Sequence, residues 1–340
     1  MNNILKELCL LNAPSGNETA VRNYILSQIQ GFAEVIIDTN GNIIAEKIGK
    51  KRAAHKIMID AHMDEVGIIA TSITPDGYIK FTTIGGIETE SLVSKRMIFE
   101  NGTLGIIGIK HGHLCDKAEL KKLPSQSSLL IDIGAKSREE AEAKVLPGDT
   151  AVFEPIFDAQ GDFIISKALD DRIGCAVLID LLKSDAEYDF TATFTIGEEI
   201  GLKGAKNVTY TIKPEAAIVI EATTAGDIGD ASECDKVCCL GSGAVVSFMD
   251  RSTLYDKTLF DAALATAEKE GITAQAKKAV AGGNNAGAIH KEIGGVRPLA
   301  ISVPCRYIHS PSSVVRYSDI LSVRDLAKVM LEKLASGEIW

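Results

Sequence analysis

The feature that most constrains the fold is a change of pattern along the chain. In residues 1–66 and 158–340, apolar segments at helical spacing alternate with short apolar segments typical of buried strands. Residues 67–157 instead carry short β-branched runs separated by turn signals such as Pro75-Asp76-Gly77 and Asn101-Gly102. We therefore expect an α/β domain from residues 1–66 and 158–340, with a small β-rich domain of residues 67–157 inserted into it.

Individual elements can be assigned within this pattern. Strands are expected at residues 57–59, 191–196, 216–220 and 299–303, and helices at residues 19–29, 173–182 and 259–270. Ser15 with Glu18, and Ser137 with Glu140, have the spacing of a capping box at the start of a helix. Together these segments predict a sheet covered by helices.

Composition excludes several classes of partner. Hydrophobic residues make up 46% and charged residues 24% of the chain, as in ordinary soluble proteins. A net charge of -10, with only short basic runs, leaves no surface for nucleic acid. No apolar stretch approaches the roughly 18 residues of a membrane span, and the start lacks the pattern of a signal peptide. Seven scattered cysteines are read as reduced thiols, so a cytoplasmic location is expected.

Acidic residues and histidines follow the expected strands or begin an expected helix. In open α/β sheets, ligands bind along the edge where strands end. Five segments could meet at this edge: His62 with Asp64, Asp170 with Asp171, Glu198 with Glu199, Glu221, and His309.

His62 and Asp64 form an H-x-D pattern at the end of a strand. Alternation in an extended segment places both side chains on the same side. Asp64 could then hold the imidazole in one tautomer while the other ring nitrogen binds a metal. A structural histidine satisfied by a neighbouring carboxylate is the alternative.

The two acidic pairs also allow two interpretations each. One of Asp170 and Asp171 could simply cap the following helix, but adjacent carboxylates repel each other unless a metal ion or Arg172 compensates. Glu198 and Glu199 could be a surface pair, or one could ligate metal while the other reaches a metal-activated water. Two histidines and three carboxylates suit two borderline cations such as zinc or cobalt, with one carboxylate shared.

The sequence resembles the tetrahedral and glutamyl aminopeptidases of metallopeptidase family forty-two, also labelled FrvX or cellulase M. The resemblance spans nearly the whole chain. It is carried by residues 13–18, Ala61-His62-Met63-Asp64-Glu65-Val66-Gly67, residues 132–135, Ala168-Leu169-Asp170-Asp171-Arg172, Glu198-Glu199-Ile200-Gly201-Leu202 and Arg306-Tyr307-Ile308-His309-Ser310-Pro311.

The resemblance implies a role for each site residue. One metal ion would be bound by His62, Asp170 and Glu221, and the other by Asp170, Glu199 and His309. Asp64 would orient His62. Glu198 would be the general base toward a metal-activated water that hydrolyses N-terminal residues from peptides.

The resemblance also implies an architecture and an assembly. The larger domain would be zinc-exopeptidase-like, a mixed sheet flanked by helices. The inserted domain, residues 67–157, would be PDZ-like or barrel-like and would mediate dimerisation. Family members form homo-oligomers, in which dimers assemble into tetrahedral dodecamers that admit peptides.

Three positions depart from the family pattern. Glu221 stands where aspartate is common. Asn284 and Asn285 replace Thr-Asp in a Gly-Gly-Thr-Asp-Ala segment, so an acid near the substrate pocket is expected to be missing. Ser313 stands where a glutamate is common.

Three other functions are weighed against an aminopeptidase. A metal-dependent deacylase of small amides would use the same activation of water. An endoglucanase-type glycosidase needs two carboxyl groups about 5 to 9.5 Å apart, but leaves the histidines unexplained. A non-catalytic assembly or binding protein is suggested only by the changes at Asn284, Asn285 and Ser313.

Overall fold

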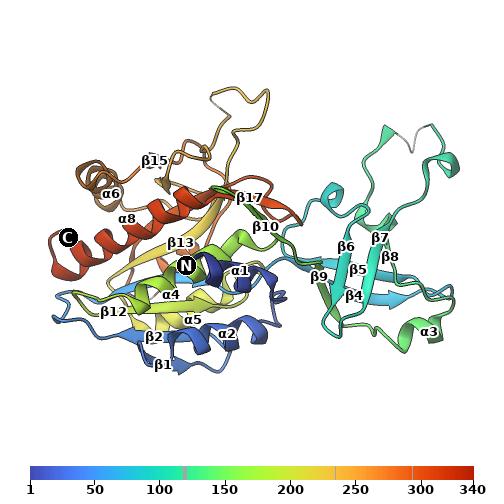
Figure 1. The fold of residues 1–340 in the computed structure, drawn as a ribbon, viewed down its shortest axis with the longest axis horizontal. Helices are drawn as coiled ribbons and strands as arrows, with labels where there is room; N and C mark the ends of the chain where they lie inside the picture. The colour runs from blue at the N-terminus through green and yellow to red at the C-terminus, as the bar shows by residue number, and fades with distance from the viewer. Residues whose placement is uncertain (118–120, 234, 293) are drawn as a thin grey trace.

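The computed structural model describes residues 1–117, 121–233, 235–292 and 294–340, and shows two bodies joined side by side (Figure 1). The larger body is built on an eight-stranded sheet and the smaller on a closed barrel. This confirms the predicted mixed α/β fold with an inserted small barrel. None of the described helices combines the length and apolar character that crossing a membrane requires.

The large sheet contains strands from both ends of the chain. Its order is β1 (Glu34–Ile37), β2 (Ile43–Lys47), β12 (Phe190–Thr195), β3 (Ile57–His62), β13 (Ala216–Thr224), β16 (Arg297–Cys305), β14 (Ala244–Val246) and β15 (Ala274–Ala276). The central strands β12, β3, β13 and β16 are parallel to their neighbours in this group. Every residue of β3 is buried, as expected for a parallel strand covered on both faces. The carboxyl ends of these strands therefore meet at one edge.

Helices cover both faces of the sheet and form two separate apolar cores. One face is covered by α1 (Asn2–Leu10), α2 (Thr19–Ile29), α4 (Leu169–Lys183), α6 (Lys257–Glu270) and α8 (Tyr317–Ser336). The opposite face is covered by α5 (Lys203–Ile212) and α7 (Ala286–Ile289). In Figure 1, α8 and α4 run across the near side of the sheet.

The barrel is made from consecutive strands between residues 67 and 153. It closes in the order β4 (Gly67–Ile73), β5 (Ile79–Ile84), β8 (Leu130–Asp132), β7 (Leu104–Gly108), β6 (Arg96–Phe99) and β9 (Thr150–Phe153). It has its own core, and α3 (Arg138–Glu142) packs against β4. A small sheet of β10 (Phe157–Gln160), β11 (Phe163–Ser166) and β17 (Ser313–Arg316) follows it.

The two predicted capping boxes have different outcomes. Ser137 caps α3, because its side chain accepts a hydrogen bond from the backbone N–H of Glu140. The box at Ser15 and Glu18 is wrong. Glu18 accepts from the N–H of Gly16, and Ser15 donates its hydroxyl to the carboxylate of Asp64 at 2.6 Å. Ser15 therefore contacts the predicted site, although its local sequence pattern is typical of a helix cap.

The described cysteines are all free thiols, namely Cys9, Cys115, Cys175, Cys238, Cys239 and Cys305. Cys234, also predicted to be reduced, lies outside the described residues.

A buried ionic cluster ties α1 to the strand end that begins the site. Lys167 lies 2.7 Å from both carboxylate oxygens of Glu65, and Arg172 donates to one of them at 3.1 Å. Arg172 also donates to the carbonyl of Leu8 in α1. The arginine therefore compensates Glu65 and not the Asp170–Asp171 pair, for which the sequence left a metal ion or Arg172 as alternatives.

Removing one partner of this buried cluster should strongly destabilise the protein. We expect Lys167→Met to lower the free energy of unfolding by about 3–5 kcal/mol, because Glu65 would remain buried without its main partner. Urea unfolding followed by circular dichroism measures this. Lys51→Met, which removes a pair between exposed Lys51 and Glu187, is the matched control and should change stability little. Equal effects of the two substitutions would contradict the role of the cluster.

Candidate metal centre

All five predicted segments meet at the edge where the parallel strands end. His62 is the last residue of β3, and Glu221 lies inside β13 rather than after it, because that strand is longer than predicted. Glu198 and Glu199 follow β12, Asp170 lies in the first turn of α4, and His309 follows β16. Their convergence produces two groups of side chains.

Asp170 stands between the two histidines. Its Oδ1 lies 3.3 Å from Nε2 of His62, and its Oδ2 lies 3.2 Å from Nε2 of His309. A further carboxylate faces each histidine: Oε1 of Glu221 lies 3.4 Å from His62 Nε2, and Oε1 of Glu199 lies 3.2 Å from His309 Nε2. These side chains form two sets of three possible metal ligands, and Asp170 belongs to both sets.

Hydrogen bonds select the nitrogen that each histidine presents. Nδ1 of His62 lies 3.1 Å from the carbonyl oxygen of Asp64, and Nδ1 of His309 lies 2.7 Å from that of Gly86. A carbonyl only accepts, so each Nδ1 carries the proton and, in a neutral ring, each Nε2 presents a lone pair. Lone pairs on Nε2 and on carboxylates then face each other, an arrangement that a cation between them would stabilise.

The distances between these nitrogen and oxygen atoms, and one buried oxygen without a hydrogen-bond donor, are consistent with such cations. Two ligands of a tetrahedral zinc ion, each about 2.0–2.1 Å from the metal, are about 3.3–3.4 Å apart. Nε2 of each histidine is 3.2–3.4 Å from its carboxylate oxygens. Oε1 of Glu199 is buried and has no hydrogen-bond donor among the described residues. Such a group is costly to bury unless something unseen satisfies it.

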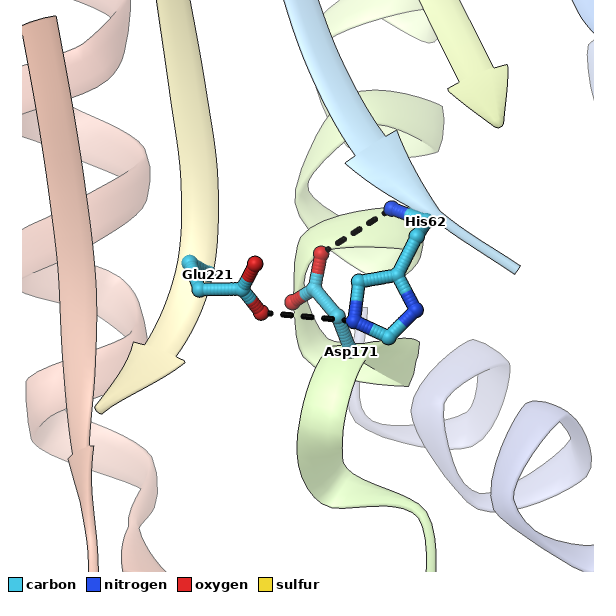
Figure 2. Close-up of side chains that lie close together, drawn as sticks. All are labelled: His62, Asp171 and Glu221. Carbon is cyan, nitrogen blue, oxygen red and sulfur yellow. Dashed lines mark hydrogen bonds and ion pairs between the residues drawn. The ribbon is translucent and has the colours of Figure 1, made fainter. Parts of the chain in front are cut away.

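Asp171 belongs to another close group but has different partners. His62, Asp171 and Glu221 lie close together (Figure 2), and each offers a ligand atom within 4.8 Å of the others. However, Oδ1 of Asp171 accepts from the N–H of Gly174 at 2.9 Å, and Oδ2 from the N–H of His62 at 3.3 Å. Asp171 therefore caps α4 and holds the end of β3, whereas both oxygens of Asp170 face histidine nitrogens.

Asp64 organises the turn that follows β12. Its Oδ1 and Oδ2 accept from the backbone N–H groups of Glu198 and Glu199, at 3.1 and 3.2 Å. The same carboxylate accepts from Ser15 and lies 3.4 Å from Nδ1 of His62. One buried side chain thus fixes both adjacent glutamates relative to the histidine.

The barrel also contributes to the site. Gly85 and Gly86 follow β5 and approach Glu199 and His309. A Cβ at Gly85 would lie 2.8 Å from Val66 Cγ1 and 3.2 Å from Glu199 Cβ, and its φ of +80° is also best suited to glycine. The carbonyl of Gly86 can therefore reach His309, whose own φ of 58° is unusual for a residue other than glycine.

The electrostatics reflect crowded carboxylates. Burial raises the pKa of Glu198 to about 8, helped by the charges of Glu199 and Asp170 and opposed by His62. Burial also raises the pKa of Glu221 well above its usual range, with Asp170 adding to the effect. The pKa of Asp170 is lowered despite burial, because the two histidines face its oxygens. Bound cations would let these carboxylates ionise together.

A cavity of about 350 Å³ opens directly onto the site. Its lining includes Asp170, Glu198, Glu221 and His309. The lining also includes exposed Glu88 from the barrel, and Arg251, Lys277 and Asn284 from the larger body. A small substrate could therefore reach both histidine groups and Glu198.

Asn285, where the family pattern has an acid, does not itself line the cavity. Asn285 is 1% exposed and donates to buried Asp60 and to Thr195, at 2.7 and 2.8 Å. Asn284 does line the cavity and accepts from the N–H of Ala286. Ser313 donates to the carbonyl of Tyr307 and so supports the turn before His309.

Sequence reasoning missed three contributors to the site: Ser15, the carbonyl of Gly86, and Lys277. The Ser15 pattern is shared with ordinary helix caps. A carbonyl oxygen carries no sequence signal. Lys277 is followed by Lys278 and resembles an ordinary surface pair.

Comparison with known proteins gives a consistent match over most of the chain. The model of a family described as M42 glutamyl aminopeptidase matches residues 41–326. The glutamyl aminopeptidase of Lactococcus lactis is 31% identical, covering 98% of this chain and 97% of that protein. The lysyl aminopeptidase of Pyrococcus furiosus is also 31% identical, covering 97% and 96%. The TET1 peptidase of Pyrococcus horikoshii, which can assemble into a tetrahedron or a large octahedral shell, superimposes with a TM-score of 0.84 at 33% identity, covering 98% and 99%.

The different partners of Asp170 and Asp171 generate a prediction. Asp170→Ala should remove bound divalent metal, because both groups lose their shared carboxylate. Asp171→Ala should retain the metal but lower the free energy of unfolding by about 1–2 kcal/mol through loss of the helix cap. Mass spectrometry of metal content after dialysis, with urea unfolding, distinguishes the two. Equal metal loss in both variants would show that Asp171 is a ligand.

Proposed function

Because this chain belongs to the family of M42 glutamyl aminopeptidases, it is a peptidase, and we propose that it removes N-terminal residues from peptides with two divalent metal ions. The observation that supports this most strongly is Asp170 lying between two histidines, each also faced by another carboxylate. One set would be His62, Asp170 and Glu221. The other would be Asp170, Glu199 and His309.

The ions would be zinc or cobalt, because imidazole and carboxylate donors suit these cations. When bound, they would activate a water molecule and polarise the scissile carbonyl. Glu221 is one methylene longer than the common aspartate, but its Oε1 still reaches His62 at 3.4 Å. The longer side chain is therefore compatible with the same site.

Glu198 would be the general base. It lines the cavity, and no hydrogen bond or ion pair engages its side chain within the described part of the chain. Its backbone is fixed by Asp64, so its carboxylate is held beside the cavity without being committed to either histidine. Glu198 would take a proton from the attacking water and deliver it to the leaving amine. Asp64 would act by positioning His62 and this turn.

Replacing the proposed base tests the assignment. Glu198→Gln should lower kcat/KM on aminoacyl anilides and short peptides by about 10²–10⁴-fold with zinc, cobalt or manganese, since the amide cannot accept the proton. Glu270→Gln, the same change at an exposed position on α6, should leave kcat/KM unchanged. Full activity in Glu198→Gln would refute the general-base role.

The same panel separates the alternative functions. A deacylase would prefer N-acyl amino acids to substrates with an unblocked N-terminus. A glycosidase would hydrolyse a cellulose derivative in the presence of a chelator, whereas peptide hydrolysis should disappear with the metal. An inactive assembly protein would purify without two ions per chain.

We also propose a homo-oligomer in which barrels pair to form dimers that assemble into a tetrahedral dodecamer. The TET1 peptidase supports such an assembly. On the barrel, β7 exposes Leu104 and Ile106, at 46% and 51% of their surface. Apolar side chains exposed side by side on a strand suit a contact between subunits.

A charge placed on this strand should break the assembly. Ile106→Glu should reduce the particle mass measured by light scattering, because the carboxylate would be buried at the contact. Ile36→Glu, at a 62% exposed position on β1 of the larger body, is the matched control. An unchanged mass for Ile106→Glu would exclude β7 from the interface.

A further inference from the structure

Lys277 is a buried cation beside the cavity. It directly follows β15, and only 6% of its surface is exposed. Its ammonium group donates to the carbonyl of Ala281 at 2.7 Å, and the residue lines the cavity of the candidate metal centre. Within the described residues, no carboxylate lies close enough to form an ion pair with it. A buried charge is normally paired, because desolvation without a counter-ion is costly.

Lys167 is also deeply buried, and a carboxylate pairs with its charge. Lys167 lies 2.7 Å from both oxygens of Glu65 and also donates to the carbonyl of Leu11. Among the described residues, the ammonium group of Lys277 bonds only to the carbonyl oxygen of Ala281. Burial accordingly lowers the pKa of Lys277, with Asp250 opposing that change. A carboxylate bound near Lys277 would supply the counter-ion that its buried charge lacks.

Asp250, which acts on Lys277 at longer range, is already committed to its own loop. One of its oxygens accepts from the N–H groups of Ser252 and Thr253, at 2.7 and 2.8 Å. The other accepts from the hydroxyl of Tyr255 at 2.7 Å. These bonds hold the loop that carries Arg251, so Asp250 supports the cavity wall instead of pairing with Lys277.

Arg251 places a second cation in the lining of the cavity. Its backbone N–H donates to the carbonyl of Gly282, which fixes the loop of residues 250–255 against residues 281–284. The residue is exposed, and no ion pair of its guanidinium is found in the described part of the chain. The lining of the cavity therefore contains two cations that lack a carboxylate partner among the described residues.

The acidic residues of the lining are of two kinds. Asp170, Glu198 and Glu221 belong to the candidate metal centre, where bound cations would offset their charge. Glu88 is the remaining acid among the described residues of the lining, and it is exposed on the barrel. A substrate bound at the metal centre can therefore extend to Lys277 and Arg251, which line the same cavity.

We infer that Lys277, with Arg251, forms a subsite that binds a carboxylate of the peptide substrate. The inference rests on the proposed aminopeptidase function and names the chemistry that this function would favour. The carboxylate could come from the side chain of an N-terminal glutamate or aspartate, or from the free C-terminus of a very short peptide. Both present the same group to the two cations, as bidentate or charge-assisted hydrogen-bond acceptors.

Paired substrates test the subsite and separate the two sources. Glutamyl and glutaminyl anilides differ only in the side-chain carboxylate, and Leu-Gly and Leu-Gly amide differ only in the terminal one. The wild type should favour the charged member of at least one pair. Lys277→Met should reduce that preference by about tenfold or more, because a charge-assisted hydrogen bond is lost. The affected pair identifies the source.

Three further variants serve as controls. Lys277→Arg should retain much of the preference, since the charge remains. Lys278→Met makes the same change at the adjacent exposed position, outside the cavity lining, and should have no effect. Arg251→Met, at an exposed position that is not needed for the core, should weaken the preference about threefold or more, and it keeps the test valid if Lys277→Met does not fold.

The outcomes distinguish this inference from the proposed function. If leucyl anilide is hydrolysed but neither preference changes in Lys277→Met and Arg251→Met, the aminopeptidase proposal stands and the subsite is wrong. If no substrate is hydrolysed with any metal, the proposed function fails. Calorimetric binding of L-glutamate and L-glutamine then decides the subsite: glutamate binding that is lost in Lys277→Met supports it, and indifference to the substitution overturns it.

Discussion

The geometry of the site depends on the buried carboxylate of Asp64. Its two oxygens receive the hydroxyl of Ser15 and the N–H groups of Glu198 and Glu199. Burial alone would raise its pKa, but its interactions with His62, the Ser15 hydroxyl and the backbone together lower it. A carboxylate satisfied in this way is rigid, since moving it would leave several buried donors without an acceptor. Three segments distant in sequence are thereby held in one arrangement.

The barrel contributes to the candidate metal centre and is also a candidate contact between subunits. The carbonyl of Gly86 holds His309, and Glu88 lines the cavity. Ala13 donates to Glu65 immediately before the barrel begins, and Pro14 forms a bridge with Glu65. The larger body therefore supplies most of the charged groups, whereas the barrel holds one histidine and adds Glu88 to the lining of the cavity.

A site residue could be predicted where a short sequence pattern around it was sufficient to place it. The strand-end positions of His62 and Asp64, and of Glu198 and Glu199, could be read from short patterns, because apolar alternation places them at the end of a strand. The division of labour between Asp170 and Asp171 could not, since either residue can cap a helix. Ser15 was misread for the same reason. Lys277 gave no signal, because a lysine in sequence does not reveal whether its counter-ion is present.

By itself, the sequence determined the mixed α/β fold, the inserted barrel and the kinds of donor gathered at the sheet edge. These depend on periodicity and on residue types within short segments, which act locally. The tertiary structure alone decided which oxygen faces which nitrogen and which cations line the cavity. Such contacts join residues far apart in the chain: 108 positions separate His62 from Asp170, and 139 separate Asp170 from His309. Only the packing of the sheet, its helices and the barrel brings them together.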